Sequence, residues 1–513
     1  MQQPVLMIGL DAAEPELIER WTSDGTLPHL ARLRAAGSYH RLASSAAWLA
    51  GSPWPTFYTG TSPAAHGLYH FLQWRPERLA LARPDADWLA VDPFWRALAG
   101  PRSLVVDAPM VYPPAPFAGI EISGWATHDH LRPPASHPPD QLARLQAAHG
   151  GAPVAEEALG LQAPRVLQAL RAELLHAVGC VTAATEGLMR TEPWDLCLAT
   201  FAATHRGGHK LWDASGMRGA IGPGDDAALF AALREIYRAC DAAVGRLAAA
   251  AGETARLLVF SLHGMGPNTG RHEILPALLE AVLTGRAPAA PVARPGLQRL
   301  RQLVPVEWRH DVKRRLPQAW QDRLTGFWRT VPGRAGLPDA FTLLSDQQGY
   351  LRVNLQGRER SGTVPAGAER ERLLARIAEG LGSFRDADSG APLVAAIGRT
   401  EDLFPDGCRR DLLPDLIVRW SDTPAARHRA IVSDRFGSIA WPTPGRNPDG
   451  RAGNHRGTGF LIATGDGLPA AADQGAADIR DLAPTVCALL GVAPPWPMEG
   501  RPIAALTGAP ARR

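Results

Sequence analysis

The sequence predicts an α/β fold with a central, mostly parallel sheet and helices on both faces. Two runs of strand length, "PVLMIGL" and "LLVFSL", are almost entirely apolar, as is typical of strands buried on both faces of a parallel sheet. Between them lie helical patterns such as "DDAALFAALREIYRACDAAVGRLAAAAG", which ends at Gly252, a residue suited to a helix C-terminus. Further strand candidates are "SLVVDAP", "WDLCLATF", "PDLIVRW" and "GFLIATG".

The amino-acid composition limits which binding partners and which cell compartment we expect for the protein. The 513 residues carry a formal net charge of +3, and no Lys/Arg run with interleaved aromatics marks a nucleic-acid groove, so nucleic acid is not an expected partner. The five cysteines are odd in number and form no CxxC pair. They indicate reduced thiols and a cytoplasmic location. With no signal sequence and no run of about 18 apolar residues, we expect no membrane association. The sequence does not indicate an oligomeric state.

The composition shifts towards Arg, Trp, Gln and Pro between residues 287 and 337, as in "RLRQLVPVEWRHDVKRRLPQAWQDRL". We interpret residues 287–337 as an inserted basic helical segment. Its charges are those of a solvated amphipathic surface, although they also suit an acidic ligand. Residues 1–286 and 338–513 are then expected to form the α/β catalytic core.

Four histidines and one aspartate stand beside predicted strand ends. Asp11 ends the first strand, His205 and His209 follow "WDLCLATF", His263 follows "LLVFSL", and His455 lies in a glycine-rich loop before "GFLIATG". Ligands of α/β sheets bind at the carboxyl ends of the strands, so these side chains are expected to share one pocket. Neutral imidazoles with a carboxylate suit a divalent transition metal.

Several long segments together resemble the alkaline phosphatase superfamily, in its type I phosphodiesterase/nucleotide pyrophosphatase-like branch. They are "MIGLDAAEPELIERWTSDGTLPHLARLRAAG", "WPTFYTGTSPAAHGLYHF", "VDAPMVYPPAPFAGIEISG", "NLQGRERSGTV" and "DLAPTVCALLGVAPPWPMEGRPI". The resemblance runs nearly end to end. It implies an alkaline phosphatase-like fold and a metal-dependent hydrolase of phosphoesters.

Members of the family usually hold two metals, often zinc, and the resemblance implies metal ligands at Asp11, His205, His209, His263 and His455. Two positions depart from the family pattern. His205 stands where an aspartate is expected, and Leu262 stands where the carboxylate of a DHG motif is expected. Zinc is the preferred metal, with manganese and iron as alternatives. The lost carboxylates make a single three-histidine centre an alternative to two metals.

The family nucleophile, a serine or threonine, falls on Ala50, which has no hydroxyl. Ser52 is the nearest substitute, and Ser52 and Asp11 are therefore the candidate catalytic residues. Because Ser52 precedes Pro53, it also fits the N-cap of a helix, where its hydroxyl would face the helix N-terminus.

Two arginines, Arg358 in "GRERSG" and Arg456 beside His455, are candidate substrate-binding residues because guanidinium groups match anionic oxygens. Surface ion pairs are the alternative explanation for both. The segment "THDHL", residues 127–131, offers further donors, although short polar loops are usually solvated.

The leading hypothesis is a metal-dependent hydrolase acting on a small phosphoester or similar anionic ester. Without a hydroxyl at Ala50, attack by metal-activated water is expected in place of a covalent intermediate. Two alternatives remain. One is a mononuclear three-histidine enzyme with non-phosphoryl chemistry, such as a lyase or an iron-dependent redox enzyme. The other is a non-catalytic binding protein on the same scaffold.

Overall fold

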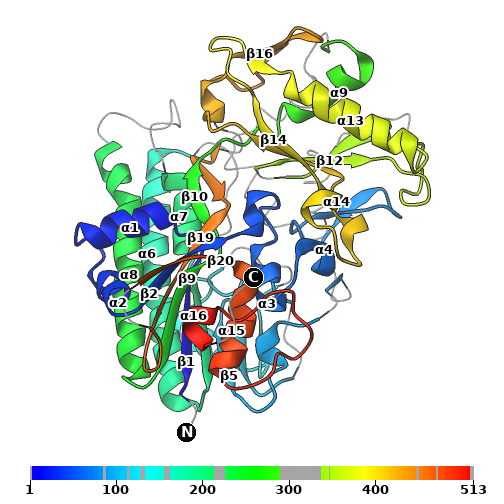
Figure 1. The fold of residues 1–513 in the computed structure, drawn as a ribbon. Coiled ribbons are helices and arrows are strands. Elements are labelled where there is room, and N and C mark those ends of the chain that lie inside the picture. Colours follow the sequence, from blue (N-terminus) through cyan, green and yellow to red (C-terminus); the bar gives the residue numbers. More distant parts are fainter. Residues whose placement is uncertain are drawn as a thin grey trace.

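The computed structural model describes the chain except for residues 1–2, 85–87, 90, 113–115, 128–132, 155–161, 213–225, 289–319, 321–336, 346, 446, 448–449, 470–471 and 509–513. The described residues form two lobes, and Figure 1 shows the smaller one above and to the right of the larger one. The larger, main lobe is built on a nine-stranded sheet. Its strands, in spatial order, are β20 (Ala472–Asp478), β2 (Ser38–Ala43), β19 (Thr458–Thr464), β9 (Arg256–Ser261), β1 (Val5–Leu10), β8 (Leu196–Phe201), β5 (Ser103–Val106), β6 (Gly119–Ser123) and β7 (Ala135–His137).

The centre of this sheet is parallel, as predicted. Strand β1 pairs in parallel with β8 on one side and with β9 on the other, whereas β19 and β7 run antiparallel to their neighbours. All six residues of β1 are buried. Val5 and Met7 face one hydrophobic core, and Leu6 and Ile8 face the other. Burial on both faces explains why the strand reads as a continuous apolar run.

Helices cover both faces of the sheet, which confirms the predicted fold class. Figure 1 shows one layer of helices to the left of the sheet and another in front and to the right. The first layer contains α1 (Pro15–Ser23), α2 (Pro28–Ala36), α5 (Gln141–His149), α6 (Pro164–Thr191), α7 (Ala203–Leu211) and α8 (Asp226–Ala251). The second layer contains α3 (Pro53–Thr59), α15 (Leu482–Leu489) and α16 (Ala504–Thr507).

By length and composition alone, helix α6 could span a membrane, since it has 28 residues and an 18-residue window of mean hydropathy 1.2. Its apolar side chains have another use in this fold. Leu167, Leu174 and Val181 are buried in the core that α6 shares with α8 and the sheet. The helix is therefore a core element of the main lobe.

The second lobe has sheets and a hydrophobic core of its own. A four-stranded sheet has the order β11 (Ala340–Leu343), β12 (Gly349–Val353), β15 (Leu416–Trp420) and β14 (Val394–Arg399), and a three-stranded sheet the order β13 (Arg385–Asp386), β16 (Ala430–Ser433) and β17 (Gly437–Ala440). Its helices are α9 (Leu275–Thr284), α13 (Ala368–Gly382) and α14 (Thr400–Leu403).

The predicted catalytic core, residues 1–286 and 338–513, includes residues of both lobes. Residues 338–513 do not all join the nine-stranded sheet, because residues 340–440 supply the sheets of the second lobe. The predicted basic insert, residues 287–337, lies almost wholly outside the described residues, as do residues 128–131 of the "THDHL" loop. Their assignments stay predictions.

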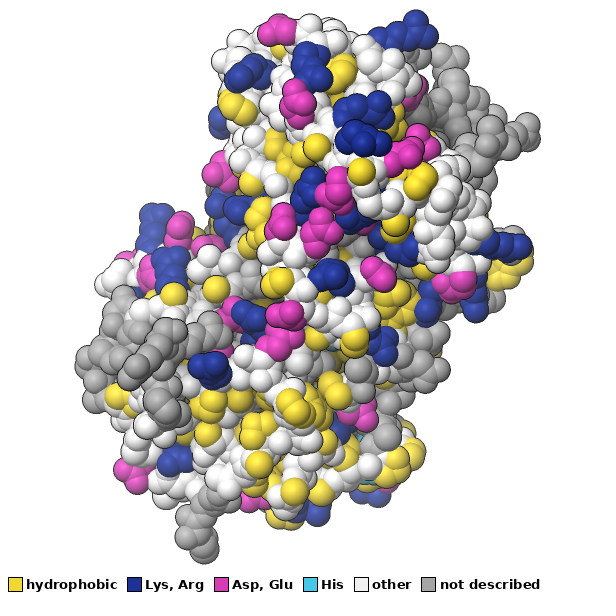
Figure 2. All heavy atoms as spheres, turned by 45° about the vertical axis from the view of Figure 1, so that its right-hand side comes forward, with side chains coloured by type: hydrophobic (Ala, Val, Ile, Leu, Met, Phe, Trp, Pro, Cys, Tyr) yellow, Lys and Arg dark blue, Asp and Glu magenta, His cyan; other side chains and the backbone are white. Residues whose placement is uncertain are grey.

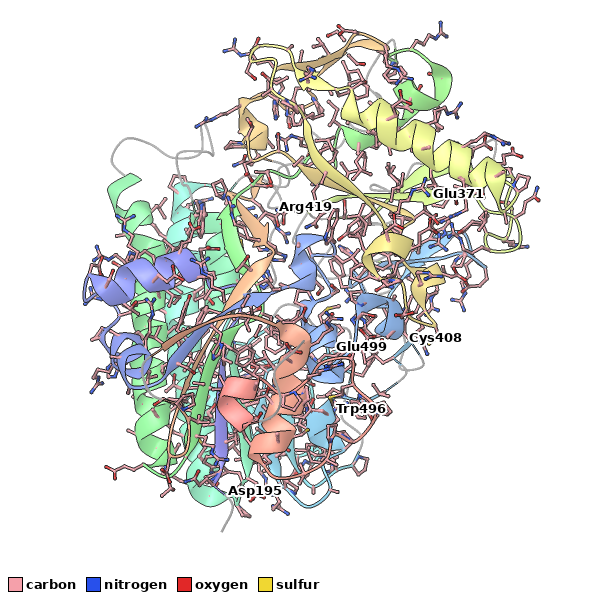
Figure 3. The ribbon with its side chains drawn as sticks, in the orientation of Figure 1. Asp195, Glu371, Cys408, Arg419, Trp496 and Glu499 are labelled. Atoms are coloured by element: carbon pink, nitrogen blue, oxygen red, sulfur yellow. The ribbon has the colours of Figure 1, made fainter. Side chains whose placement is uncertain are left out.

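The chain passes between the lobes through two adjacent strands, β10 (Gly264–Pro267) and β18 (Gly453–Arg456), which pair antiparallel. A second junction lies where the sheet of β12 and β15 packs against main-lobe residues such as Leu49 and Tyr69. Here the Arg419 guanidinium of β15 lies 5.1 Å from the centre of the Trp48 ring, at the position labelled in Figure 3. On the face drawn in Figure 2, basic and acidic side chains of the described residues are interspersed.

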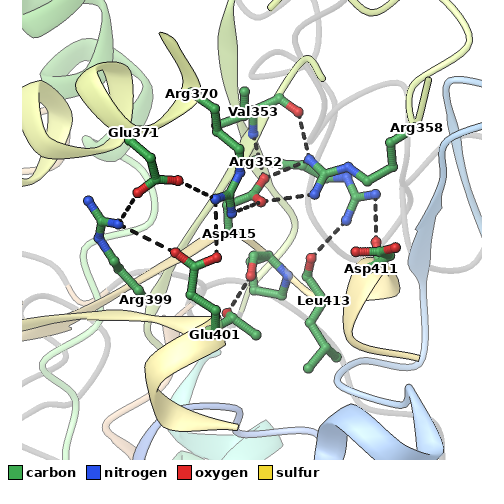
Figure 4. A network of polar contacts seen from close by, with 12 residues as sticks. Arg352, Val353, Arg358, Arg370, Glu371, Arg399, Glu401, Asp411, Leu413 and Asp415 are labelled. Atoms are coloured by element: carbon green, nitrogen blue, oxygen red, sulfur yellow. Dashed lines mark hydrogen bonds and ion pairs between the residues drawn. The ribbon is translucent and has the colours of Figure 1, made fainter. Parts of the chain in front are cut away.

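A network of ion pairs holds the second lobe together at the start of β15 (Figure 4). Asp415 accepts two hydrogen bonds from the Arg358 guanidinium, at 2.9 and 2.7 Å, and one from Arg370 at 3.1 Å. The neighbouring pair of Arg352 and Glu359 is fully buried, with a contact of 2.6 Å. Burial would lower the pKa of Arg358, but hydrogen bonds to Asp415 raise it above its usual value. Arg358 is therefore a structural residue.

We expect Arg358→Ala to lower the free energy of unfolding by about 3 kcal/mol, because it removes two hydrogen bonds to the buried Asp415 carboxylate, whose remaining bond to a guanidinium is the longer one from Arg370. Arg360→Ala, an exposed arginine two positions away, should change it by no more than about 0.5 kcal/mol. Chemical denaturation measures both. Equal losses in the two variants, or reduced metal binding in Arg358→Ala, would show that the network does not have this role.

Candidate metal centre

Three neighbouring parallel strands bring the candidate ligands to one edge of the main sheet. Asp11 directly follows β1, His205 lies in α7 just after β8, and His263 follows β9. His455 arrives on β18, which precedes the antiparallel strand β19 and therefore enters at the same edge. All five predicted residues, including His209, line a single pocket there.

Three of the histidines converge through their Nε2 atoms. The Nε2 atom of His205 lies 3.0 Å from that of His209 and 2.8 Å from that of His455. All three residues are buried, and their ligand atoms lie within 4.8 Å of one another. Four residues separate His205 from His209, so both rings lie on the same face of α7. Nitrogen ligands of one tetrahedral zinc lie about 3.3 Å apart, close to this spacing.

The remaining ring nitrogens set which tautomers are present. Nδ1 of His209 donates to the Gly453 carbonyl oxygen at 2.9 Å, and Nδ1 of His205 lies 2.7 Å from Oδ2 of Asp11. Such bonds leave Nε2 as the atom that presents a lone pair to a metal. Nδ1 of His455 is buried without a hydrogen-bond partner among the described residues. Burial, reinforced by the neighbouring imidazoles, holds the pKa of His455 well below its usual value.

This donor set fits a divalent transition metal. Three neutral imidazoles form a recognised zinc site with a position left for water. Their lone pairs face one another in a buried space, an arrangement that a cation stabilises. His205, His209 and His455 are therefore the residues that would hold the ion.

Asp11 is not one of the three converging donors, but it supports this cluster by bonding His205. Its Oδ2 atom bonds Nδ1 of His205, and its Oδ1 atom accepts a 2.9 Å hydrogen bond from the Trp54 indole nitrogen. Burial would raise the pKa of the Asp11 carboxyl, but His205, His263 and Trp54 hold it well below its usual range. A carboxylate that orients a histidine ligand in this way raises the basicity of its other nitrogen.

A second metal position has few donors. His263 Nε2 lies 3.8 Å from Oδ1 of Asp11, and His263 and Asp11 fall outside the one group of potential ligands found among the described residues. Leu262 stands where the family has a carboxylate, and its side chain is buried in the core. The turn after His263 is held by Glu14, whose Oε2 atom accepts the Met265 N–H at 2.9 Å. A Cβ at Gly264 would lie 2.2 Å from that oxygen, which explains the glycine.

The pocket also contains residues that sequence reasoning missed. It is lined by Asp11, Ala50, Gly51, Pro53, Trp54, His70, Phe71, Met110, His205, His209, His263, Arg451 and His455. Arg451 lies just before β18 and lines the pocket, whereas Arg456 directly follows His455 on β18 and therefore faces the opposite side of the strand from it. The alternation of side chains along a strand was a signal against Arg456.

Neither predicted substrate-binding arginine lies in the pocket. Arg358 is engaged with Asp415 in the second lobe. Arg456 is exposed, and its guanidinium lies across the backbone of Gly266. A Cβ added to Gly266 would come within 1.9 Å of the Arg456 Nε atom. The structure thus places both away from the histidines.

Ser52 is the N-cap residue of α3, and Pro53 is the first helical residue, as the sequence predicts. Its hydroxyl does not cap the helix, however, contrary to the interpretation from sequence. It lies 2.7 Å from both the Leu49 carbonyl oxygen and the Ser45 hydroxyl, and Ser52 is not a lining residue of the pocket. Ala50, at the family's nucleophile position, does line it.

The Ser52 hydroxyl belongs to a buried chain that ends at His66. Ser45 Oγ lies 3.3 Å from Thr56 Oγ1, which lies 3.0 Å from Nε2 of His66. Nδ1 of His66 accepts the Leu68 N–H at 3.0 Å, so its proton is on Nε2 and is donated to Thr56. Burial, with a smaller effect of Arg409, lowers the pKa of His66 to about 3.

Replacing Trp54 with phenylalanine should weaken metal binding about tenfold, because outer partners of metal-ligating histidines affect affinity on that scale. Phenylalanine keeps an aromatic ring but loses the bond to Asp11. Trp95→Phe is the matched control, since its indole donates to Glu121 at 2.9 Å outside the pocket. Competition with a chromogenic chelator measures both, and equal affinities would exclude this role for Trp54.

Protonation of His66 should destabilise the fold in acid. Its pKa is about 3 in the folded protein and 6.5 as the reference value, so between these values the unfolded chain binds the proton more readily. Stability therefore falls as the pH drops from 6.5 towards 3, by at most about 1.4 kcal/mol per pH unit from this group. In His66→Gln the fall should be shallower. Denaturation midpoints across this range give the comparison, and parallel curves would contradict the assignment.

The chain is similar to known structures along almost its whole length. The chain is similar to phosphonoacetate hydrolase from Sinorhizobium meliloti 1021, with 15% identity, 96% of each chain covered and a TM-score of 0.50. It is also similar to human ectonucleotide pyrophosphatase/phosphodiesterase 5, with 14% identity, 97% of each chain covered and a TM-score of 0.46. At such identities the likeness to the hydrolase concerns the fold alone. No curated protein sequence matches the chain.

The family model described as type I phosphodiesterase/nucleotide pyrophosphatase matches residues 5–324, more than half of the chain. The matched range includes β1 with Asp11, α7 with its two histidines and the turn of His263. The chain belongs to the type I phosphodiesterase/nucleotide pyrophosphatase family of the alkaline phosphatase superfamily.

Proposed function

We propose that the protein is a metal-dependent hydrolase that cleaves a phosphoester or similar anionic ester at a single three-histidine centre. The observation that carries this proposal is the convergence of the Nε2 atoms of His205, His209 and His455 in a buried pocket. A divalent transition metal bound there would polarise the scissile group and activate water for attack. Zinc is the preferred ion for such donors, with manganese and iron as alternatives.

The protein's own residues supply orientation and charge. Asp11 and the Gly453 carbonyl fix the two histidines of α7, and Trp54 fixes Asp11. Arg451 contributes a positive charge to the pocket wall, which suits an anionic substrate. His263 lines the same pocket and provides an imidazole able to hold or move a proton near the ligand.

The route of attack follows from the residues beside the pocket. Ala50 has no hydroxyl, and the Ser52 hydroxyl is bonded to Leu49 and Ser45 outside the lining of the pocket. Covalent catalysis requires a nucleophile within about 3–3.5 Å of the reacting atom. We therefore propose direct attack by water, without a phospho-enzyme.

The same departures favour a second candidate function. With Leu262 in the core and His205 in place of an aspartate, the site has fewer negative charges than the family's two-metal centre. Such a centre suits a mononuclear lyase or an iron-dependent redox enzyme. A non-catalytic binding protein is the third candidate. The five free cysteines support the proposal of a reducing, cytoplasmic compartment.

The purified protein should contain about one transition metal per chain, and His209→Ala should lose both metal and hydrolysis of phosphomonoester and phosphodiester test substrates. Elemental analysis and colorimetric assays measure these outcomes. Protein that takes up neither zinc, manganese nor iron would contradict both enzymatic candidates. Iron binding without ester hydrolysis would favour the second candidate, and a trapped phosphoserine at Ser52 would exclude direct attack by water.

A further inference from the structure

The pocket wall made by Ala50 and Gly51 is held in place from both lobes. On the main-lobe side, Ser52 bonds the Leu49 carbonyl oxygen and is linked through Ser45 and Thr56 to His66. Gly51 packs directly against the backbone of Tyr69, which is not a lining residue of the pocket, since a Cβ at Gly51 would come 2.4 Å from the Tyr69 carbonyl oxygen. The segment therefore has no room to shift towards Tyr69.

The second lobe contributes one hydrogen bond to this wall. The Ala50 N–H donates to the hydroxyl of Tyr350 at 3.1 Å, in a buried environment. Tyr350 lies on β12, where alternate residues face opposite sides. Gly349 and Leu351 face the core of the second lobe, whereas Tyr350 packs against the main lobe.

Two further contacts make this junction firm. The Tyr350 ring packs edge to face on Tyr69, with ring centres 5.8 Å apart. Gln348, which directly precedes β12, donates to the Ala46 carbonyl oxygen at 2.8 Å. The segment before α3 is thus bound to the second lobe at both Ala46 and Ala50.

We propose that Tyr350 is a positioning residue through which the second lobe fixes the wall at Ala50 and so sets the shape of the ligand pocket. Without its hydroxyl, the Ala50 N–H would be buried and unsatisfied, which is costly enough for the segment to move. The three histidines that would hold the metal come from α7 and β18. Tyr350 therefore affects binding of the small-molecule ligand and not binding of the metal. The expected effect on ligand binding rests on the proposed function, whereas the position of Ala50 can be measured independently of that function.

Tyr350→Phe tests the proposal because it removes the hydroxyl and keeps the ring. Tyr69→Phe is the matched control. Tyr69 is the ring partner of Tyr350, and its hydroxyl likewise accepts a backbone N–H, that of Trp74 at 3.2 Å, which is not a pocket residue. The two variants should therefore lose similar thermal stability and keep the same zinc content.

Two readouts separate the variants. Hydrogen–deuterium exchange of the Ala50 amide, resolved by mass spectrometry of the full chain, should be at least about fivefold faster in Tyr350→Phe than in wild type or Tyr69→Phe. Inorganic phosphate should bind the zinc-loaded Tyr350→Phe protein about fivefold more weakly, with unchanged binding to Tyr69→Phe. Unchanged Ala50 exchange would overturn the proposal, as would equal phosphate affinities in the two variants. Wild-type protein without zinc or phosphate binding would count against the proposed function, while the exchange result still decides the role of Tyr350.

Discussion

The hydrogen bond between Asp11 and His205, 2.7 Å long and buried, is the constraint on which the candidate centre depends. A charged carboxylate in such a place requires partners, and Asp11 has them in His205 and Trp54. Because Nδ1 of His205 is committed to Asp11, its Nε2 atom faces His209 and His455. The end of β1 thereby determines the geometry of a site whose other members come from α7 and β18.

This arrangement explains how one family scaffold accommodates a changed site. The resemblance assigned Asp11 to a metal directly, yet in this chain a histidine occupies the neighbouring aspartate position and takes the Asp11 carboxylate as its own partner. Leu262 removes another carboxylate by joining the core. Both changes support the proposed single centre rich in imidazoles in place of a two-metal centre rich in carboxylates.

The sequence predicted the fold and the gathering of the five candidate metal ligands, because both depend on local patterns. Apolar runs mark buried parallel strands, and residues that follow such strands meet at one edge, which is how Asp11, His205, His209, His263 and His455 gather. Other features depend on contacts between distant residues. Arg358 pairs with Asp415 across 57 positions, and the second lobe combines strands separated by long connections. The Ser52 hydroxyl accepts no N–H from its helix and bonds Leu49 and Ser45 instead, a detail that composition cannot reveal.

X-ray absorption spectroscopy of the metal-loaded protein tests the central claim most directly. The account predicts a single ion with three imidazole nitrogens at about 2.0–2.1 Å and only light atoms completing its coordination. A metal–metal distance of about 3.5–4 Å would instead show a two-metal centre. A first shell dominated by carboxylate oxygen, with Asp11 as a direct ligand, would likewise contradict the three-histidine account.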